Sequence, residues 1–176
     1  MTAIARRIQA QALGAERTVL SLDPGVKQLG WARWVSGQLS GAGLSRTKAD
    51  DVEDAAIAHM DGVPGPRCDV VVVERMTHYP GLGSKSQPAA NDLLDLQLIG
   101  AFVAGKHLAT GGSMIHVRPH EWKGQAPKNI MEKRIERALS DMELARLSYA
   151  LEKVPASLQH NVVDAVGIGL WFFRRL

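Results

Sequence analysis

Two acidic residues of this sequence stand at the ends of apolar runs. The segment TVLSLD, residues 18–23, ends on Asp23 before a Pro-Gly turn, and the segment DVVVVE, residues 69–74, ends on Glu74. A carboxylate buried without a partner is costly, so such an acid needs a cation, a hydrogen-bond donor or a metal ion nearby. Cation binding is therefore the chemistry that these two residues could supply.

The two apolar runs are predicted to be neighbouring β-strands. Residues 18–22 have the pattern of a buried strand, and residues 69–74 form a continuous β-branched run that is typical of a central strand buried on both faces. Adjacent strands lie about 5 Å apart in a sheet, so acids at two such strand ends can share one ion.

A third acid lies in the last predicted helix, within QHNVVDAVGIGL, residues 159–170. Asn161 and Asp164 are three residues apart and therefore lie on one helical face. Each glycine of this segment lowers helix propensity by about 1 kcal/mol, which a close approach of the helix to the sheet would explain. Such packing would bring Asp164 to the two acids at the strand ends.

The other predicted elements complete one domain, residues 17–176, after a flexible N-terminal arm, residues 1–16. Further strands are predicted over 30–35, 38–45 and 113–117, and helices after the acidic cluster at 50–54 and over 90–109, 127–140 and 156–173. Antiparallel strands followed by alternating helices and strands favour an α/β fold with a mixed sheet flanked by helices.

The segment between the second acid and the next helix is predicted to be a long loop. Residues 78–88, HYPGLGSKSQP, are rich in Gly, Pro and Ser, and long loops beside a strand end are often functional. The following helix is interpreted as largely buried, with a face wider than one sheet contact requires. Its apolar residues are Leu94, Leu98, Ala101 and Phe102, with Leu93, Leu96 and Ile99 at the margins.

The composition excludes several classes of protein. The chain has 176 residues, 45% hydrophobic and 22% charged, and no apolar run reaches the roughly 18 residues that span a bilayer. One cysteine, Cys68, excludes an internal disulfide and a multi-cysteine zinc site, and it fits a cytoplasmic location. The net charge of +3 permits a polyanionic partner, and bases gather at Lys123, Lys128, Lys133, Arg134 and Arg137.

The four tryptophans are predicted to be core residues because their neighbours are apolar. Trp122 is the one most open to another interpretation, because it precedes Lys123 in a loop flanked by prolines.

Three segments together resemble the RuvC family of Holliday-junction resolvases, within the ribonuclease H-like superfamily. They are LSLDPGVKQLGWA at residues 20–32, VVVVER at 70–75 and HNVVDAVGIGL at 160–170. Their order and spacing match the family from residue 18 to the end of the chain. The family places its carboxylates on the first strand, the fourth strand and the last helix. The resemblance implies a ribonuclease H-like mixed five-stranded sheet flanked by helices.

The resemblance makes Asp23, Glu74 and Asp164 the metal-binding, catalytic acids. The position three before the last acid holds Asp or His in bacterial members, and here it is Asn161. An amide oxygen can bind Mg²⁺ but brings no charge, so the second of two ions would be held more weakly. His160, four residues before Asp164, is the alternative ligand, and the sequence leaves this choice open.

The implied activity is that of a crossover junction endodeoxyribonuclease, which makes paired symmetric nicks with two Mg²⁺ ions, or Mn²⁺ in their place. Lys123, a catalytic residue in this reading, and Lys128 would contact the phosphates that flank the cut. Further DNA contacts are predicted at Arg75, Lys133, Arg134 and Lys85, and His78 and Tyr79 are candidates to stack on an unpaired base. The family's stacking aromatic falls nearer Thr77, which leaves the base preference of the cut open.

Family members act as homodimers, often beside a branch-migration motor, and the helix at 90–109 is the candidate dimer face. Two alternatives remain. One is a branched-DNA nuclease with relaxed preference, and the other is a junction-binding protein that has lost cleavage, for which Asn161 is the supporting feature. The actin-like ATPase and sugar-kinase superfamily has a similar Asp-x-Gly turn, but a chain of 176 residues has no room for its second domain.

Overall fold

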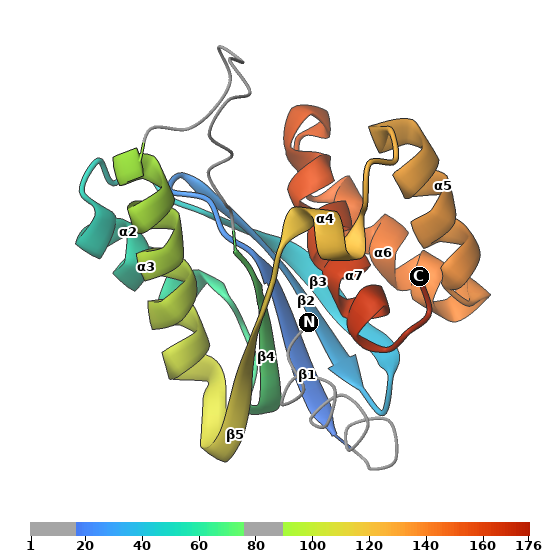
Figure 1. Ribbon diagram of the computed structural model, residues 1–176, viewed down its shortest axis with the longest axis horizontal. Coiled ribbons are helices and arrows are strands. Elements are labelled where there is room, and N and C mark those ends of the chain that lie inside the picture. Colours follow the sequence, from blue (N-terminus) through green and yellow to red (C-terminus); the bar gives the residue numbers. More distant parts are fainter. Residues whose placement is uncertain (1–16, 76–89) are drawn as a thin grey trace.

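A mixed sheet of five strands runs through the centre of the computed structural model, which describes residues 17–75 and 90–176 (Figure 1). The strands are β1 (Thr18–Asp23), β2 (Gln28–Val35), β3 (Gln38–Arg46), β4 (Cys68–Glu74) and β5 (Leu108–Val117). Their order is β3-β2-β1-β4-β5. The first three strands pair antiparallel, whereas β4 is parallel to both β1 and β5. The prediction of a mixed five-stranded sheet is confirmed.

Helices cover both faces of this sheet (Figure 1). One face carries α2 (Val52–Gly62) and α3 (Ala90–His107), and the other carries α4 (Pro119–Trp122), α5 (Lys128–Ala138), α6 (Asp141–Glu152), the 3₁₀ turn η1 (Ala156–Leu158) and α7 (Gln159–Phe172). Each face has its own apolar core: Leu20 and Leu22 of β1 pack in the core beneath α2 and α3, and Val19 packs in the core on the face of α7. Because both faces are covered, side chains at the strand ends are the ones placed to meet a ligand.

None of the helices in the described part of the chain is long and apolar enough to cross a membrane. The predicted N-terminal arm, residues 1–16, lies outside the described residues.

Glycines on both elements allow α7 to approach the sheet closely. A Cβ atom on Gly30 of β2 would lie 2.0 Å from the backbone oxygen of Asn161. A Cβ atom on Gly169 of α7 would lie 2.2 Å from the indole of Trp34. Contacts this short do not occur, so a larger residue at either position would push helix and sheet apart. The close approach predicted from the glycines of this helix is thus present at Gly169.

A buried hydroxyl on β1 fixes the position of α7 along the sheet. Ser21 Oγ donates to the carbonyl of Ala165 at 2.7 Å and accepts a hydrogen bond from Trp34 Nε1 at 3.0 Å. Ser21 is 0% exposed, so these contacts satisfy polar groups that water cannot reach. Ser21 precedes Asp23 by two residues and Ala165 follows Asp164. The contact therefore sets the two acids relative to each other.

The region after β4 differs from the prediction. Helix α3 ends at His107 and β5 begins at Leu108, whereas the helix was predicted through residue 109 and the strand only from 113. Parallel pairing with β4, which begins at Cys68↔Leu108, draws these residues into the sheet. Residues 141–152, for which no element was predicted, form α6.

The apolar face predicted for α3 is only partly buried. Ile99 and Val103 are 0% exposed, but Leu94, Leu98 and Phe102 are 64%, 37% and 47% exposed. The interpretation of a largely buried helix is therefore wrong for Leu94, Leu98 and Phe102, which we call the α3 stripe. Periodicity identified the apolar residues but not which of them the sheet covers.

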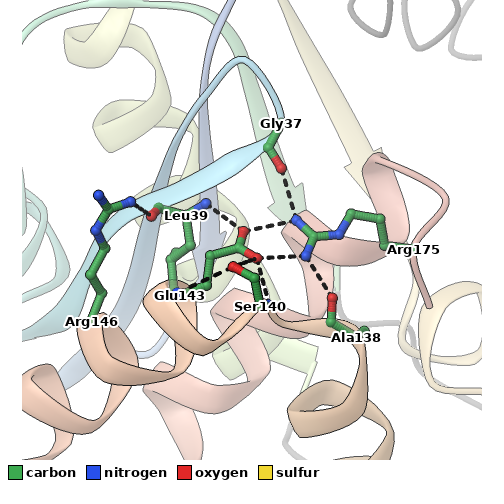
Figure 2. Close-up of polar contacts among 7 residues, drawn as sticks. All are labelled: Gly37, Leu39, Ala138, Ser140, Glu143, Arg146 and Arg175. Carbon is green, nitrogen blue, oxygen red and sulfur yellow. Dashed lines mark hydrogen bonds and ion pairs between the residues drawn. The ribbon is translucent and has the colours of Figure 1, made fainter.

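The carboxylate of Glu143 on α6 lies at the centre of a buried polar network (Figure 2). Arg175 donates from Nη1 to Oε1 at 2.8 Å and from Nη2 to Oε2 at 2.7 Å. The backbone N–H of Leu39 donates to Oε1 at 2.8 Å, and Ser140 donates to Oε2 from its N–H at 2.9 Å and from Oγ at 3.0 Å. Arg175 also donates to the carbonyls of Gly37 and Ala138. The network joins the end of the chain to the β2–β3 hairpin and the α5–α6 junction.

Candidate active site

Two of the predicted acids meet at one edge of the sheet. The parallel pairing of β1 with β4 runs to Leu22↔Val73, so Asp23 and Glu74 follow at the carboxyl ends of neighbouring strands. Glu74 is 6% exposed and Asp23 is partly buried, and the charge of Glu74 acts on Asp23. The valine run that makes β4 a central strand thus carries its terminal acid into the interior.

Helix α7 supplies the third acid, and the segment after α4 supplies a cation. Lys123 Nζ lies 3.3 Å from Asp164 Oδ2 and 3.7 Å from Glu74 Oε1. The charge of Asp164 also acts on Asp23. The structure therefore brings the three predicted acids together and places the predicted Lys123 among them.

The indole of Trp122 contacts this cluster, which sequence reasoning missed. Trp122 Nε1 donates a hydrogen bond to Glu74 Oε1 at 2.7 Å, and the side chain is 5% exposed. Lys123 Nζ lies 4.7 Å from the centre of the same ring. The prediction of a core position is confirmed. The sequence EWKG places a tryptophan beside a cation, but only the fold shows that the indole reaches Glu74.

The electrostatics of the cluster reflect three acids around one ammonium. Removal from water raises the pKa of Asp23 well above its usual range, and the charges of Glu74 and Asp164 raise it further, whereas Lys123 opposes the shift. Burial acts to lower the pKa of Lys123, but the three acids outweigh it and raise that pKa above its usual value. The cluster is therefore short of positive charge.

This donor set suits a hard divalent cation. Carboxylate oxygens are the ligands that Mg²⁺ prefers, and a cluster with more acids than bases gains from a second positive charge. As they stand, the side chains in residues 17–75 and 90–176 include no group of three His, Cys, Asp or Glu residues that could hold a metal ion. Lys123 lies against two of the acids instead. Asp23, Glu74 and Asp164 are the residues whose chemistry fits such an ion.

A pocket of about 240 Å³ opens beside Asp164, between α5 and α7. Its polar lining residues are Lys123, Lys128, Glu132, His160 and Asp164. His160 and Asp164 thus share one wall, one helical turn apart. Asn161 packs its backbone carbonyl against Gly30 of β2. The position of His160 keeps it a candidate ligand beside Asn161.

The basic side chains that are predicted to contact DNA, where they lie in the described residues, are accessible to solvent. Lys128 begins α5 and lines the same pocket as Lys123. Lys133 and Arg134 are exposed on α5, and Arg75 is exposed directly after Glu74. The other predicted DNA contacts, His78, Tyr79 and Lys85, lie outside the described residues.

The fold is shared with solved structures of Holliday junction resolvases. Thermus thermophilus RuvC in complex with a Holliday junction substrate is 18% identical, with a TM-score of 0.58 over 90% of this chain and 94% of that chain. A second Thermus thermophilus RuvC structure is 15% identical, with a TM-score of 0.55 over 90% and 95% of the two chains. The yeast mitochondrial Holliday junction resolvase Ydc2 is 13% identical, with a TM-score of 0.56 over 98% and 84%.

No protein-family model matches the sequence, and no curated protein is significantly similar to it. At these identities the structural likeness establishes the fold. The chain therefore has the α/β fold of the ribonuclease H-like class. Within that class its fold is that of the RuvC-type Holliday junction resolvases.

Proposed function

We propose that the protein is a metal-dependent endonuclease that resolves four-way DNA junctions by paired symmetric nicks. The observation that carries the proposal is the convergence of Asp23, Glu74 and Asp164 around a single ammonium at the edge of a resolvase-type sheet. Three acids with one nearby base have the donor chemistry that a divalent cation requires, and such cations serve phosphodiester hydrolysis.

The residues of the chain would divide the work as follows. Asp23, Glu74 and Asp164 would hold Mg²⁺ or Mn²⁺, with Asn161 or His160 as the fourth ligand. Two such ions would supply the chemistry of phosphodiester hydrolysis, which is activation of a water molecule and stabilisation of the leaving oxygen. Lys123 would offset charge on the phosphate at the cut.

The DNA backbone would run across the face of the molecule that carries the pocket between α5 and α7. Lys128 at the start of α5 and the exposed Lys133 and Arg134 further along it would contact phosphates, which makes binding salt-dependent. Such contacts carry no sequence information, so the choice of cut site must depend on other residues.

Cleavage of a labelled mobile four-way junction tests the proposal directly. The protein and its Asp164→Asn variant are each incubated with the junction and with linear duplex, in Mg²⁺, Mn²⁺ or EDTA. We expect symmetric nicks in the junction, and no nicks with EDTA or with the variant. Equal cutting of flaps and forks would favour a nuclease with relaxed preference. Tight junction binding without cutting would favour a binding protein, and an Asn161→Asp variant would then be the one to assay for restored cleavage.

The α3 stripe supports the proposal that the protein acts as a homodimer. Leu94, Leu98 and Phe102 form an exposed apolar row along one side of α3, and such rows commonly mark protein interfaces. We expect the parent protein to be dimeric by light scattering, and Leu98→Glu to shift it to a monomer that still folds. Ile57→Glu, at an exposed apolar residue of α2 that is 54% exposed, is the matched control. A monomeric parent would contradict the dimer.

A further inference from the structure

The carboxylate of Glu74 is the most deeply buried of the three acids. Its side chain is 4% exposed, against 27% for Asp164. A carboxylate in such a position needs hydrogen-bond donors to satisfy its oxygens and to keep one orientation. Two consecutive residues contact this carboxylate: the indole N–H of Trp122 donates a hydrogen bond at 2.7 Å, and the ammonium of Lys123 forms an ion pair at 3.7 Å. Both contact Oε1, which leaves Oε2 for other partners.

The indole is better placed than the ammonium to orient this carboxylate. At 2.7 Å its contact with Glu74 is a short hydrogen bond, whereas the 3.7 Å contact of Lys123 is an ion pair only. Lys123 is also shared with Asp164, and its long side chain has many rotamers. A tryptophan ring packed in the core has few, so its N–H direction is fixed by the fold.

The helix that carries Asp164 holds the ring in place. A Cβ atom on Gly167 would lie 2.5 Å from Trp122 Cζ3 and 2.9 Å from Ile135 Cδ1. Gly167 follows Asp164 by one helical turn, so the ring packs on α7 while its N–H reaches β4. Gly167, which was predicted to allow a close approach of the helix to the sheet, instead makes room for the ring of Trp122.

We propose that Trp122 is a positioning residue that orients Glu74 for a divalent cation, with Gly167 providing the space for its ring. The proposal rests on the proposed metal-dependent function. By holding Oε1, the indole would fix the orientation of the Glu74 carboxylate and hence the direction of Oε2, the oxygen left for a ligand. Partners of metal-binding carboxylates commonly change metal affinity by about 10- to 100-fold when removed.

The test compares Mn²⁺ binding without DNA, by electron paramagnetic resonance, with single-turnover cleavage of a saturating four-way junction. Trp122→Phe keeps an apolar ring but loses the N–H donor. We expect Mn²⁺ affinity to fall about 10-fold or more, and the cleavage rate to fall with it at subsaturating Mn²⁺. The affinity for the junction itself should stay unchanged, because the exposed lysines remain. Trp31→Phe, the same exchange on the other sheet face, is the control.

Two further variants separate the hydrogen bond from packing. Benzothienylalanine at position 122 keeps the shape of the indole without its N–H, and we expect it to bind Mn²⁺ as weakly as Trp122→Phe does. Gly167→Ala should weaken Mn²⁺ binding in the parent by displacing the ring. In the Trp122→Phe background, where the outer ring is gone, it should add little.

The outcomes separate this inference from the proposed function. If the parent cuts junctions and the benzothienylalanine variant binds Mn²⁺ as tightly as the parent, the positioning role is wrong and the nuclease stands. If the parent binds Mn²⁺ but cuts no branched DNA, the proposed function fails and the Mn²⁺ affinities alone decide the role of Trp122. A parent that binds no Mn²⁺ would overturn both.

Discussion

Glu143 and Asp23 are both carboxylates held partly or wholly away from water, yet their pKa values move in opposite directions. Burial acts to raise the pKa of Glu143, but the hydrogen bonds of Arg175, Leu39 and Ser140 outweigh it and hold the value at about 2. Burial also raises the pKa of Asp23, and there the neighbouring charges of two other acids add to the effect. The hydrogen-bond donors around Glu143 outweigh its burial, whereas the charged neighbours of Asp23 add to the effect of its burial.

The two sites therefore serve different purposes. Glu143 has donors for both of its oxygens, including a two-pronged contact with Arg175, so its network is complete without a ligand (Figure 2). The acids around Asp23 share one lysine and gain from an added cation. An incomplete set of partners at a strand end is expected of a binding site, and it costs stability until the ligand arrives.

Removal of the Asp23 carboxylate should cause the largest loss of activity, and it should raise the stability of the fold. Asp23→Asn is expected to lower junction cleavage by more than about 100-fold, beyond the loss typical of a residue that only supports a ligand. An acid whose folded pKa is raised costs stability once the pH exceeds its usual value near 3.8. In EDTA at pH 7, the variant should therefore resist urea better than the parent.

The matched control is Asp69→Asn, at the start of β4. Hydrogen bonds from Thr18 hold the pKa of Asp69 below its usual range, so this acid contributes stability at neutral pH. Its replacement should lower stability and leave cleavage intact. Normal metal-dependent cleavage by Asp23→Asn would refute the assignment of Asp23.

Replacement of Glu143 should lower the stability of the fold and leave cleavage little changed, the reverse of the result expected for Asp23→Asn. Glu143→Gln removes a charge that Arg175 and backbone N–H groups stabilise, and the depressed pKa of about 2 corresponds to about 3 kcal/mol of unfolding free energy at pH 7. Cleavage below the unfolding temperature should be little changed. Urea unfolding and the junction assay, run on the same preparations, measure both quantities.

The pH dependence gives an independent reading of the same network. A carboxyl with a depressed folded pKa stabilises the fold fully above its usual value near 4.5, and this stability is lost as the pH falls toward about 2. The stability difference between the parent and Glu143→Gln should shrink over that interval. A difference that stays constant from pH 7 to pH 3 would mean that the carboxylate charge contributes nothing.

The sequence was sufficient to predict the parts of the site that local patterns report. An apolar run that ends on an acid reports both a strand and its last side chain, and this rule located Asp23 and Glu74. Helical spacing placed Asp164 on the last helix. The alternation of strands and helices predicted a mixed sheet, and the parallel pairing of β1 with β4 is a finding of the structure.

Contacts between distant side chains could not be predicted in this way. Trp122 and Glu74 are 48 residues apart, and Glu143 and Arg175 are 32 apart. No periodicity relates such pairs, because their meeting depends on how a helix is placed on the sheet. The sequence predicted an apolar face on α3 wider than one sheet contact requires, but it did not show which of its residues the sheet leaves exposed.

The smallest expected effect comes from Ser21, which belongs neither to the Glu143 network nor to the acid cluster around Asp23. Ser21 links β1 to α7 through a neutral hydrogen bond to the carbonyl of Ala165 at 2.7 Å, and it accepts a second one from Trp34 of β2 at 3.0 Å. Ser21→Ala leaves both groups without this buried partner, and we expect a loss of about 1–2 kcal/mol of unfolding free energy. Because the bond also sets Asp164 relative to Asp23, junction cleavage should slow several-fold.

Ser40→Ala is the matched control, because the Ser40 hydroxyl donates to the carbonyl of Arg33 at an exposed position, at 3.0 Å. It should change neither stability nor cleavage. If Ser21→Ala lowers stability as expected but cleaves at the parent rate, then the bond holds α7 on the sheet without setting the acids. The alignment of Asp164 would then depend on its contact with Lys123 and on the packing of Trp122 against Gly167.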